Sequence, residues 1–123
     1  MKRLRAVKWW YQRANRGYSD RDMWNGDVYL AGIIASTLEW YVDKGIGIPM
    51  SYAYGLDEYQ PDFDIMKQRR NEEYNKHIAI FKEYAKNGCA VDKRWQKDFG
   101  GVLDKDIRKS VKWLSKHFTE LWD

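Results

Sequence analysis

Cysteine and proline are scarce in this sequence: one residue of 123 is cysteine and two are proline. The single thiol, Cys89, excludes a disulfide within the chain and any metal site that needs several thiolates, and it suits a reducing compartment. Cys89 also lacks a histidine or acidic partner at a recognisable spacing, so the sequence does not predict a cysteine nucleophile. The two prolines, Pro49 and Pro61, bound one irregular region.

Long apolar runs are missing as well. No segment approaches the roughly 18 consecutive apolar residues that a membrane-spanning helix needs. The basic start of the chain is not followed by the apolar region of a signal peptide. No stretch alternates apolar and polar residues between hairpin turns, and there is no internal repeat. We therefore expect a helical protein that stays in the cytoplasm and makes no membrane contact through a spanning segment.

Charged and aromatic residues are abundant, and the charge is unevenly placed. The formal net charge is +4, from 22 basic and 18 acidic residues. Residues 1–16 hold six basic residues and no acidic one, so the rest of the chain carries 16 basic and 18 acidic groups, a net of −2. Seven Trp, nine Tyr and four Phe make an aromatic surplus. Trp and Tyr favour half-wet positions such as interfaces and stacking surfaces, as well as cores.

The longest segment with helical periodicity predicts a helix over residues 19–44. Ser19 is a good N-cap, and Asp22 three residues later completes a capping-box pattern. Apolar residues then recur at helical spacing until Gly45, which suits a left-handed stop. Asp27 interrupts the apolar face. Since a buried carboxylate needs a cation or several donors, Asp27 is either a structural acid bonded to an indole or an arginine, or a residue that orders a polar ligand pocket.

The other elements follow from the same criteria. We predict a basic amphipathic helix at 1–16, an irregular connection at 45–61 that packs across the bundle, a helix at 62–87, a short helix at 90–99 and an amphipathic C-terminal helix at 104–122. We expect the helix at 62–87 to begin at Asp62 and to stop at Asn87-Gly88, and we expect Asp104 to cap the last helix. These elements predict a single all-α domain: a bundle of three long helices, with a basic N-terminal helix and one short extra helix.

The basic helix at 1–16 has four interpretations. It is a solvated amphipathic helix packed on the bundle, a binding element for a small anionic ligand through Arg13 and Arg16, a nucleic-acid contact through phosphates, or a helix that lies on a membrane surface.

Two polar residues fall on the apolar face of the helix at 62–87. Arg70 is the natural candidate partner for a buried acid such as Asp27. For His77 we expect a core or hydrogen-bonded role, because Glu73 one turn away provides only a second ligand for a metal ion.

Two segments, residues 16–49 and 111–123, resemble a widespread family of small uncharacterised bacteriophage proteins with the pattern R-G-[WY]-S-D-x-D-x-W-x-x-D. The matching residues are Arg16, Gly17, Tyr18, Ser19, Asp20, Asp22, Trp24, Asp27, Pro49, Trp113, Leu114, Leu121 and Trp122. The resemblance covers roughly half of the chain and implies a phage origin, an accessory role and an all-α fold. It brings no activity and no catalytic residues. The chain departs from the family at Gly26, where a larger apolar residue is preferred.

Our first functional hypothesis is a non-enzymatic counter-defence binder that sequesters a nucleotide-type immune signal. Arginines would bind phosphate, and aromatic rings would stack a base. The expected ligand-binding residues are Trp10, Arg13, Arg16, Tyr18, Trp24, Asp27 and Arg70. Since a concave site of this kind is often built between subunits, we expect a homo-oligomer in the host cytoplasm.

Three alternatives stay open: a protein–protein interaction module that binds a host or phage protein through its aromatic residues and the connection at 45–61, a nucleic-acid-associated protein that uses the basic helix, and an enzyme. Asp20, Asp22 and Asp27 could supply carboxylates for metal-assisted hydrolysis. The first two are explained as capping residues, and no base–nucleophile pair stands out. We therefore predict no catalytic residue, metal or cofactor.

Overall fold

The structure is a computed structural model that describes residues 2–88, 90, 91, 93, 94, 96 and 101–122. Its elements are α1 (Lys2–Arg16), α2 (Asp20–Trp24), α3 (Gly26–Lys44), the 3-10 helix η1 (Met50–Ala53), α4 (Phe63–Asn87), β1 (Ala90–Val91), β2 (Val102–Leu103), α6 (Asp104–His117) and the 3-10 helix η2 (Phe118–Glu120). The all-α class is confirmed. The two short strands form a parallel pair, with Ala90 opposite Val102.

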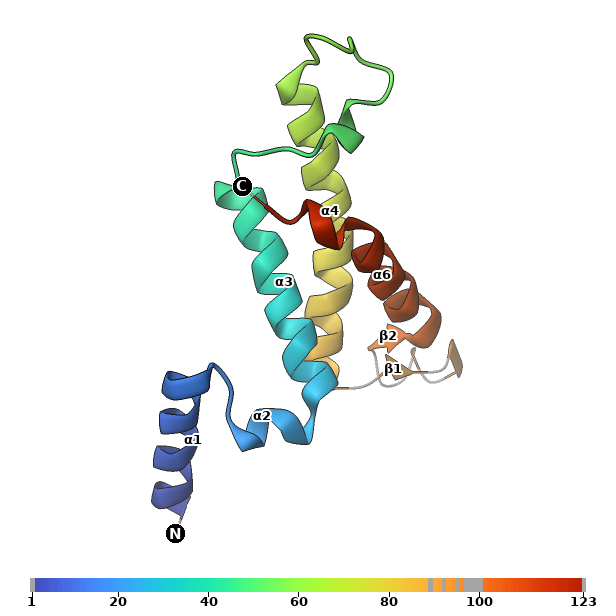
Figure 1. The fold of residues 1–123 in the computed structure, drawn as a ribbon. Helices are drawn as coiled ribbons and strands as arrows, with labels where there is room; N and C mark the ends of the chain where they lie inside the picture. The colour runs from blue at the N-terminus through green and yellow to red at the C-terminus, as the bar shows by residue number, and fades with distance from the viewer. Residues whose placement is uncertain (1, 89, 92, 95, 97–100, 123) are drawn as a thin grey trace.

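The core lies between the antiparallel helices α3 and α4, and α6 packs against α4 (Figure 1). Leu38, Met66 and Phe81 are at most 1% exposed. The buried cluster also contains Ala31, Ala35, Tyr52, Tyr74, Ile78 and Trp113. Because α3 and α6 both use α4 as their support, α4 is the central helix of the fold.

Three helix ends are formed by the residues that the sequence predicts. The Ser19 hydroxyl accepts a hydrogen bond from the Asp22 backbone N–H, and the Asp22 side chain accepts one from the Ser19 N–H, which completes the capping box. Asp62 caps α4 through its Oδ1, 2.9 Å from the Asp64 nitrogen. Gly88 ends α4 in the left-handed conformation, with φ of 79°. Local sequence therefore determines where these helices start or stop.

The predicted single helix at 19–44 is wrong, because the structure breaks it in two. Asn25 has φ of −132° and ψ of 67°, outside the helical range, and it separates α2 from α3. Asn and Gly are poor helix formers, so the Asn25–Gly26 pair opposes continuation of the helix. The break lets α1 and α2 leave the axis of α3 (Figure 1).

The predicted left-handed stop at Gly45 is also wrong. Gly45 has φ of −69° and an extended conformation, and its N–H donates to the Tyr41 carbonyl. A Cβ atom at Gly45 would lie 2.7 Å from the Tyr41 oxygen, so it is close approach that requires glycine here. Arg70 also donates to the Tyr41 carbonyl and to the carbonyls of Gly45 and Gly47 just after the helix, so a side chain rather than a left-handed turn binds this helix end.

The C-terminal part of the chain differs from prediction in three details. Ala90–Val91 form a strand rather than the start of a helix, and half of the predicted segment 90–99, like Cys89, lies outside the described residues. Leu103 occupies the N-cap position of α6 and Asp104 is the first helical residue, because the chain enters the helix directly from β2. The helix ends at His117 rather than at 122 and continues as η2.

The N-terminal helix contacts α2 but does not pack on α3, α4 or α6. No residue of α1 is buried, and Figure 1 shows this helix standing apart from α3, α4 and α6. The interpretation of 1–16 as a helix packed on the bundle is therefore wrong for the single chain. No described helix is both long and apolar enough to cross a bilayer.

Candidate functional site

The two arginines predicted to bind phosphate are paired with carboxylates of α2. Arg13 Nε donates to Asp22 Oδ2 at 2.9 Å, and its Nη2 also pairs with that carboxylate. The hydrogen bonds from Arg13 and from the Ser19 backbone hold the pKa of Asp22 well below its usual value. Arg16 Nη2 lies 2.6 Å from Asp20 Oδ1. Both arginines therefore fasten α1 to α2, and their charges are already compensated.

The three aromatic residues predicted to stack a base, Trp10, Tyr18 and Trp24, lie in different environments. Trp24 meets Trp9 edge to face, with ring centroids 5.6 Å apart. The Arg16 guanidinium lies 4.5 Å from the Tyr18 ring centroid, so a cation already covers that ring. Trp10 is 71% exposed. Of the predicted stacking rings, Trp10 is the most accessible.

Asp27 does not occupy the dry face. It is an exposed residue of the first turn of α3, and it accepts a hydrogen bond from the Tyr84 hydroxyl of α4. That hydrogen bond is the main cause of the lowered pKa of Asp27. The expectation that Arg70 is its partner is wrong, since the acid is bonded to a phenol at the open end of the helix pair.

Arg70 instead binds the C-terminal end of α3. Its side chain is 1% exposed. Its guanidinium donates to the carbonyls of Tyr41 at 2.9 Å and Gly47 at 3.0 Å, and to Asn71 Oδ1 at 3.1 Å. The last carbonyls of a helix lack intrahelical partners and carry the negative end of its dipole. Arg70 therefore satisfies buried backbone groups, which is a structural role.

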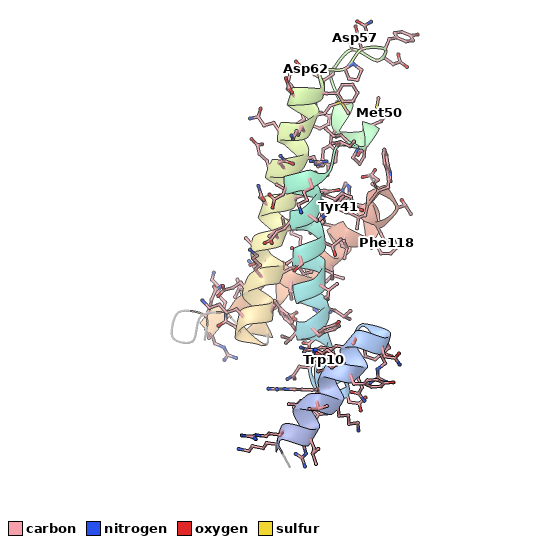
Figure 2. All side chains as sticks on the ribbon, turned by 90° about the vertical axis from the view of Figure 1, so that its left-hand side faces the viewer. Trp10, Tyr41, Met50, Asp57, Asp62 and Phe118 are labelled. Atoms are coloured by element: carbon pink, nitrogen blue, oxygen red, sulfur yellow. The ribbon has the colours of Figure 1, made fainter. Side chains whose placement is uncertain are left out.

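The predicted ligand-binding residues thus lie in separate places. On α4, Arg70 and Tyr84 are fourteen positions apart, about 21 Å along a helix. The arginines of α1 belong to a further group with α2. Figure 2 shows Trp10 at one end of the molecule and Tyr41, whose carbonyl Arg70 binds, far along α3. Within one chain the seven residues do not converge on one pocket.

A basic pocket of about 410 Å³ lies between α4 and α6. It is lined by Glu73, Lys76, His77, Lys109, Lys112, Trp113 and Lys116. Trp113 is stacked between His77, at 4.1 Å between ring centroids, and His117, at 4.8 Å. Its Nε1–H donates to Glu73 Oε1 at 2.6 Å. The signal in the sequence was the i, i+3, i+7 spacing of the α6 lysines beside Trp113.

His77 gives this region a pH dependence. The side chain is 6% exposed, its Nδ1 lies 2.9 Å from Ser110 Oγ, and burial lowers its pKa. Glu73 opposes that shift, whereas Lys76, Lys109 and His117 reinforce it.

We expect the free energy of unfolding to fall as the pH is lowered from 7 to 5. The unfolded chain binds a proton at His77 near its ordinary pKa, and the folded chain does so only at lower pH, so acidification favours unfolding. Urea denaturation at several pH values measures this effect. The variant His77→Gln should show a flatter profile over the same range, and an unchanged profile in the variant would contradict the assignment.

The connection before α4 ends in a projecting segment that we call the acidic aromatic tip, residues 54–64. Tyr54, Tyr59 and Phe63 in it are 66%, 89% and 62% exposed. Its acids are Asp57, Glu58, Asp62 and Asp64, and no basic residue occurs between Lys44 and Lys67. Figure 2 shows Asp57 at the opposite end of the molecule from Trp10. The expectation that the connection packs across the bundle holds for the buried Tyr52 but not for the tip.

Several hydrogen bonds hold the tip in one shape. Arg69 Nη1 donates to the carbonyls of Tyr52 at 3.1 Å and Tyr54 at 2.6 Å, and the guanidinium lies 4.0 Å from the Tyr54 ring centroid. Asp57 Oδ1 accepts from the backbone nitrogens of Tyr59 at 2.8 Å and Gln60 at 3.1 Å, which lowers the pKa of Asp57. Arg69 of α4 and Asp57 of the tip therefore hold this segment in shape, and the Asp57 carboxyl keeps its negative charge to a lower pH than usual.

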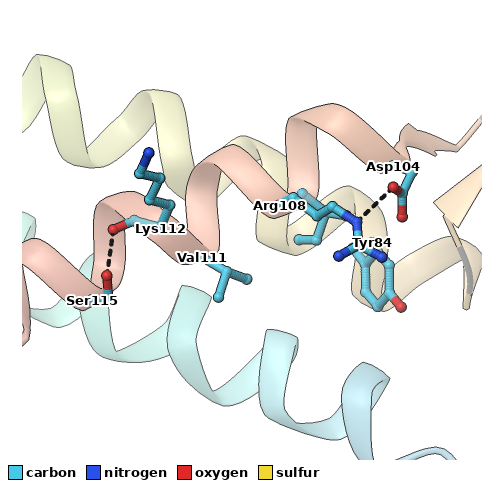
Figure 3. Close-up of a pocket in the computed structure, with 7 residues that line it drawn as sticks. Tyr84, Asp104, Arg108, Val111, Lys112 and Ser115 are labelled. Atoms are coloured by element: carbon cyan, nitrogen blue, oxygen red, sulfur yellow. Dashed lines mark hydrogen bonds and ion pairs between the residues drawn. The ribbon is translucent and has the colours of Figure 1, made fainter.

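A further pocket of about 490 Å³ is lined by Tyr84 of α4 and by one side of α6, where Asp104 and Arg108 form an ion pair (Figure 3). Over the part of the chain that the structure describes, no three His, Cys, Asp or Glu side chains are grouped to hold a metal ion. No family model, curated protein or solved structure matches the chain.

Proposed function

We propose that this chain is a non-enzymatic protein–protein interaction module, and that its acidic aromatic tip binds a positively charged surface of a partner protein. The observation that carries the proposal is the tip itself. It exposes Tyr59 and Phe63 in a segment with four acids and no base, on a backbone held by Arg69 and Asp57, while the Arg69 guanidinium covers one face of the Tyr54 ring.

The chemistry of the tip supports a protein partner. Tyr is enriched among the residues that dominate binding energy, and exposed aromatic groups are the usual anchors of an interface. Surrounding carboxylates would steer a basic partner and repel a nucleic acid. A loop that is already ordered loses less conformational entropy when it binds, which favours affinity.

The sequence supports a proposal for the domain organisation of this module and for the place where it acts. We take residues 1–123 as a single helical domain, in which the predicted bundle of three long helices is the support and the tip is the working end. The resemblance to small phage proteins supports an accessory role in the host cytoplasm, where the partner would be a host or phage protein.

The test measures capture of proteins from a bacterial lysate by the immobilised chain. We expect Tyr59→Ala combined with Phe63→Ala to reduce capture of the main partner by at least roughly tenfold, since each aromatic anchor contributes about 1–2 kcal/mol or more. Trp122→Ala removes an aromatic residue that is 51% exposed outside the tip, and it should capture as wild type does.

A charge reversal separates the acidic contribution from the aromatic one. Glu58→Lys should weaken capture and its dependence on salt, whereas Asp43→Lys, an equal reversal at an exposed site of α3, should not. If the two tip variants captured the partner as well as the two control variants do, the tip would not be the binding surface.

A second candidate function is retention of a small anionic ligand, as the sequence first suggested. The observation that favours it is the basic pocket, where Lys76, Lys109, Lys112 and Lys116 line a cavity of about 410 Å³. Trp113 is stacked on both sides by histidines, so it offers no free face to a base. A ligand there would be held through phosphate, and replacing Lys109 and Lys112 with glutamine should abolish its retention.

A further inference from the structure

The apolar stripe of α1 is largely exposed in the part of the single chain that the structure describes. Leu4, Val7, Trp10 and Tyr11 are 70%, 63%, 71% and 62% exposed. The face of α1 that contacts α2 carries Gln12, Arg13 and Arg16. At 3.6 residues per turn, the Leu4–Val7–Tyr11 stripe lies nearly half a turn away from that face. The ion pairs to α2 therefore keep the stripe turned outwards.

The outer face of α3 is also apolar and uncovered. Leu30, Ile33 and Trp40 are 56%, 48% and 45% exposed. Ile33 and Trp40 lie on the side of α3 opposite the buried residues, and Leu30 lies at the edge of that side. No charged residue occurs between Asp27 and Glu39. A helix that is apolar on all sides belongs in an interior, so α3 lacks a neighbour on this side.

A groove beside this face extends the apolar surface. A pocket of about 200 Å³ between α3 and α6 is lined by Ile33, Ile34, Thr37, Leu38, Leu114, Phe118 and Leu121. Phe118 is 67% exposed at its edge. An exposed apolar surface of this extent marks an interaction site.

We propose that a second copy of this chain covers both surfaces. In a two-fold symmetric dimer, α1 of each chain lies on the outer face of α3 of its partner, with its apolar stripe against Leu30, Ile33, Trp40 and Phe118. The stripe Leu4–Ala14 and the face Leu30–Trp40 each span ten residue steps, about 15 Å. The dimer uses surfaces distinct from the acidic aromatic tip, so the inference goes beyond the proposed function.

Charge favours this arrangement over the pairing of two α1 helices. Residues 1–16 carry six positive charges and no negative one, so two such helices packed together would repel each other. The rest of the chain carries a net charge of −2 and offers an uncharged strip of α3. The α1 helix of one copy is therefore better matched to the α3 face of another.

The area is sufficient for a stable dimer. Each contact covers the aromatic residues Trp10, Tyr11, Trp40 and Phe118, and aromatic side chains bury roughly 150–250 Å² each when fully enclosed. With the aliphatic residues and with two symmetric contacts, the total is on the order of 1,000–1,500 Å², which reaches the size of specific interfaces. Exchange of a terminal helix between copies is a common route to such dimers.

Sedimentation of the full chain over a range of concentrations tests the proposal. We expect a species of about 29.6 kDa, twice the chain mass of 14.8 kDa. Val7→Glu and, separately, Ile33→Glu should each raise the dissociation constant by at least roughly tenfold, because each places a carboxylate in the apolar contact. Arg5→Gln changes the net charge by the same amount as Val7→Glu, on the same helix but outside the stripe, and it should leave the dimer intact.

The outcomes are decisive in either direction. A monomer at all concentrations, or a dimer that both glutamate variants leave unchanged, would overturn the proposal. Binding of the wild-type chain to anionic lipid vesicles without self-association would overturn it in favour of a membrane surface. The tip variant Tyr59→Ala with Phe63→Ala should still dimerise, so a loss of partner capture and a loss of dimerisation are separate results. Circular dichroism of Val7→Glu confirms folding, which α1 affects little because it buries no residue.

Discussion

Replacement of Arg70 with methionine is expected to lower the free energy of unfolding by about 3 kcal/mol or more. The guanidinium is buried and donates to the carbonyls of Tyr41 and Gly47 at the end of α3. Methionine fills a similar volume but offers no donor. The substitution removes hydrogen bonds to the carbonyls of Tyr41, Gly45 and Gly47, and a hydrogen bond from a charged group contributes about 1.5–3 kcal/mol. Urea denaturation followed by circular dichroism measures the difference.

Two further variants make this prediction specific. Arg70→Lys should lose an intermediate amount of stability, because the single ammonium group of lysine cannot reach all the acceptors that the guanidinium binds. Arg108→Met removes an exposed arginine whose ion pair with Asp104 is solvated, and it should cost less than about 1 kcal/mol. An Arg70→Met protein as stable as wild type would show that the end of α3 does not depend on this side chain.

Trp113→Ala is expected to lower the free energy of unfolding by about 3–5 kcal/mol, the usual range for removal of a large buried aromatic residue. The indole is 9% exposed and joins α6 to α4. It is stacked on His77 and meets the Tyr74 ring edge to face at 5.5 Å between centroids. Its loss would leave a cavity in the contact between α4 and α6, detected as a lower denaturation midpoint.

Conservative and distant substitutions serve as comparisons. Trp113→Phe keeps most of the packing but removes the hydrogen bond to Glu73, so it should lose an intermediate amount of stability. Trp122→Ala, at an exposed position, should lose less than about 1 kcal/mol. If both tryptophan-to-alanine variants lost equal stability, the central place of Trp113 in the core would be contradicted.

Those parts of the fold that depend on local chemistry were predictable from the sequence. Ser19 and Asp62 cap helices as their residue types suggest, and Gly88 adopts the left-handed conformation. Helical periodicity also placed Arg70 and His77 on the buried face of α4, where both lie. These features depend on neighbouring residues, so short windows of sequence contain the information.

Features that depend on tertiary contacts were not predictable. The break at Asn25 is a different case, because the Asn25–Gly26 pair is a local signal but the apolar pattern on both sides of it predicted one continuous helix. Gly45 looks like a left-handed stop because the sequence does not reveal that a guanidinium 25 positions later binds the helix end. The parallel pairing of Ala90 with Val102 is too short to leave a periodic pattern.

For the candidate site, too, the sequence identified residue types but not the tertiary contacts that they make. The sequence identified Arg13, Arg16 and Trp24 as notable residues, but not that Asp22 is a capping residue and the ion-pair partner of Arg13 at once, or that Asp20 pairs with Arg16. Composition revealed the aromatic surplus, whereas exposure decides which rings are free for binding. The apolar outer face of α3 is visible in the sequence, yet periodicity cannot say whether a neighbour covers it.

The measurement that tests the central claim most directly is native mass spectrometry of the chain recovered from a bacterial lysate. It reports bound proteins and bound small molecules in the same spectrum. We predict a complex with a basic protein that disappears when the tip carries Tyr59→Ala and Phe63→Ala, and no retained small molecule. A stoichiometric small anion without any protein partner would contradict the interaction module and favour the basic pocket between α4 and α6.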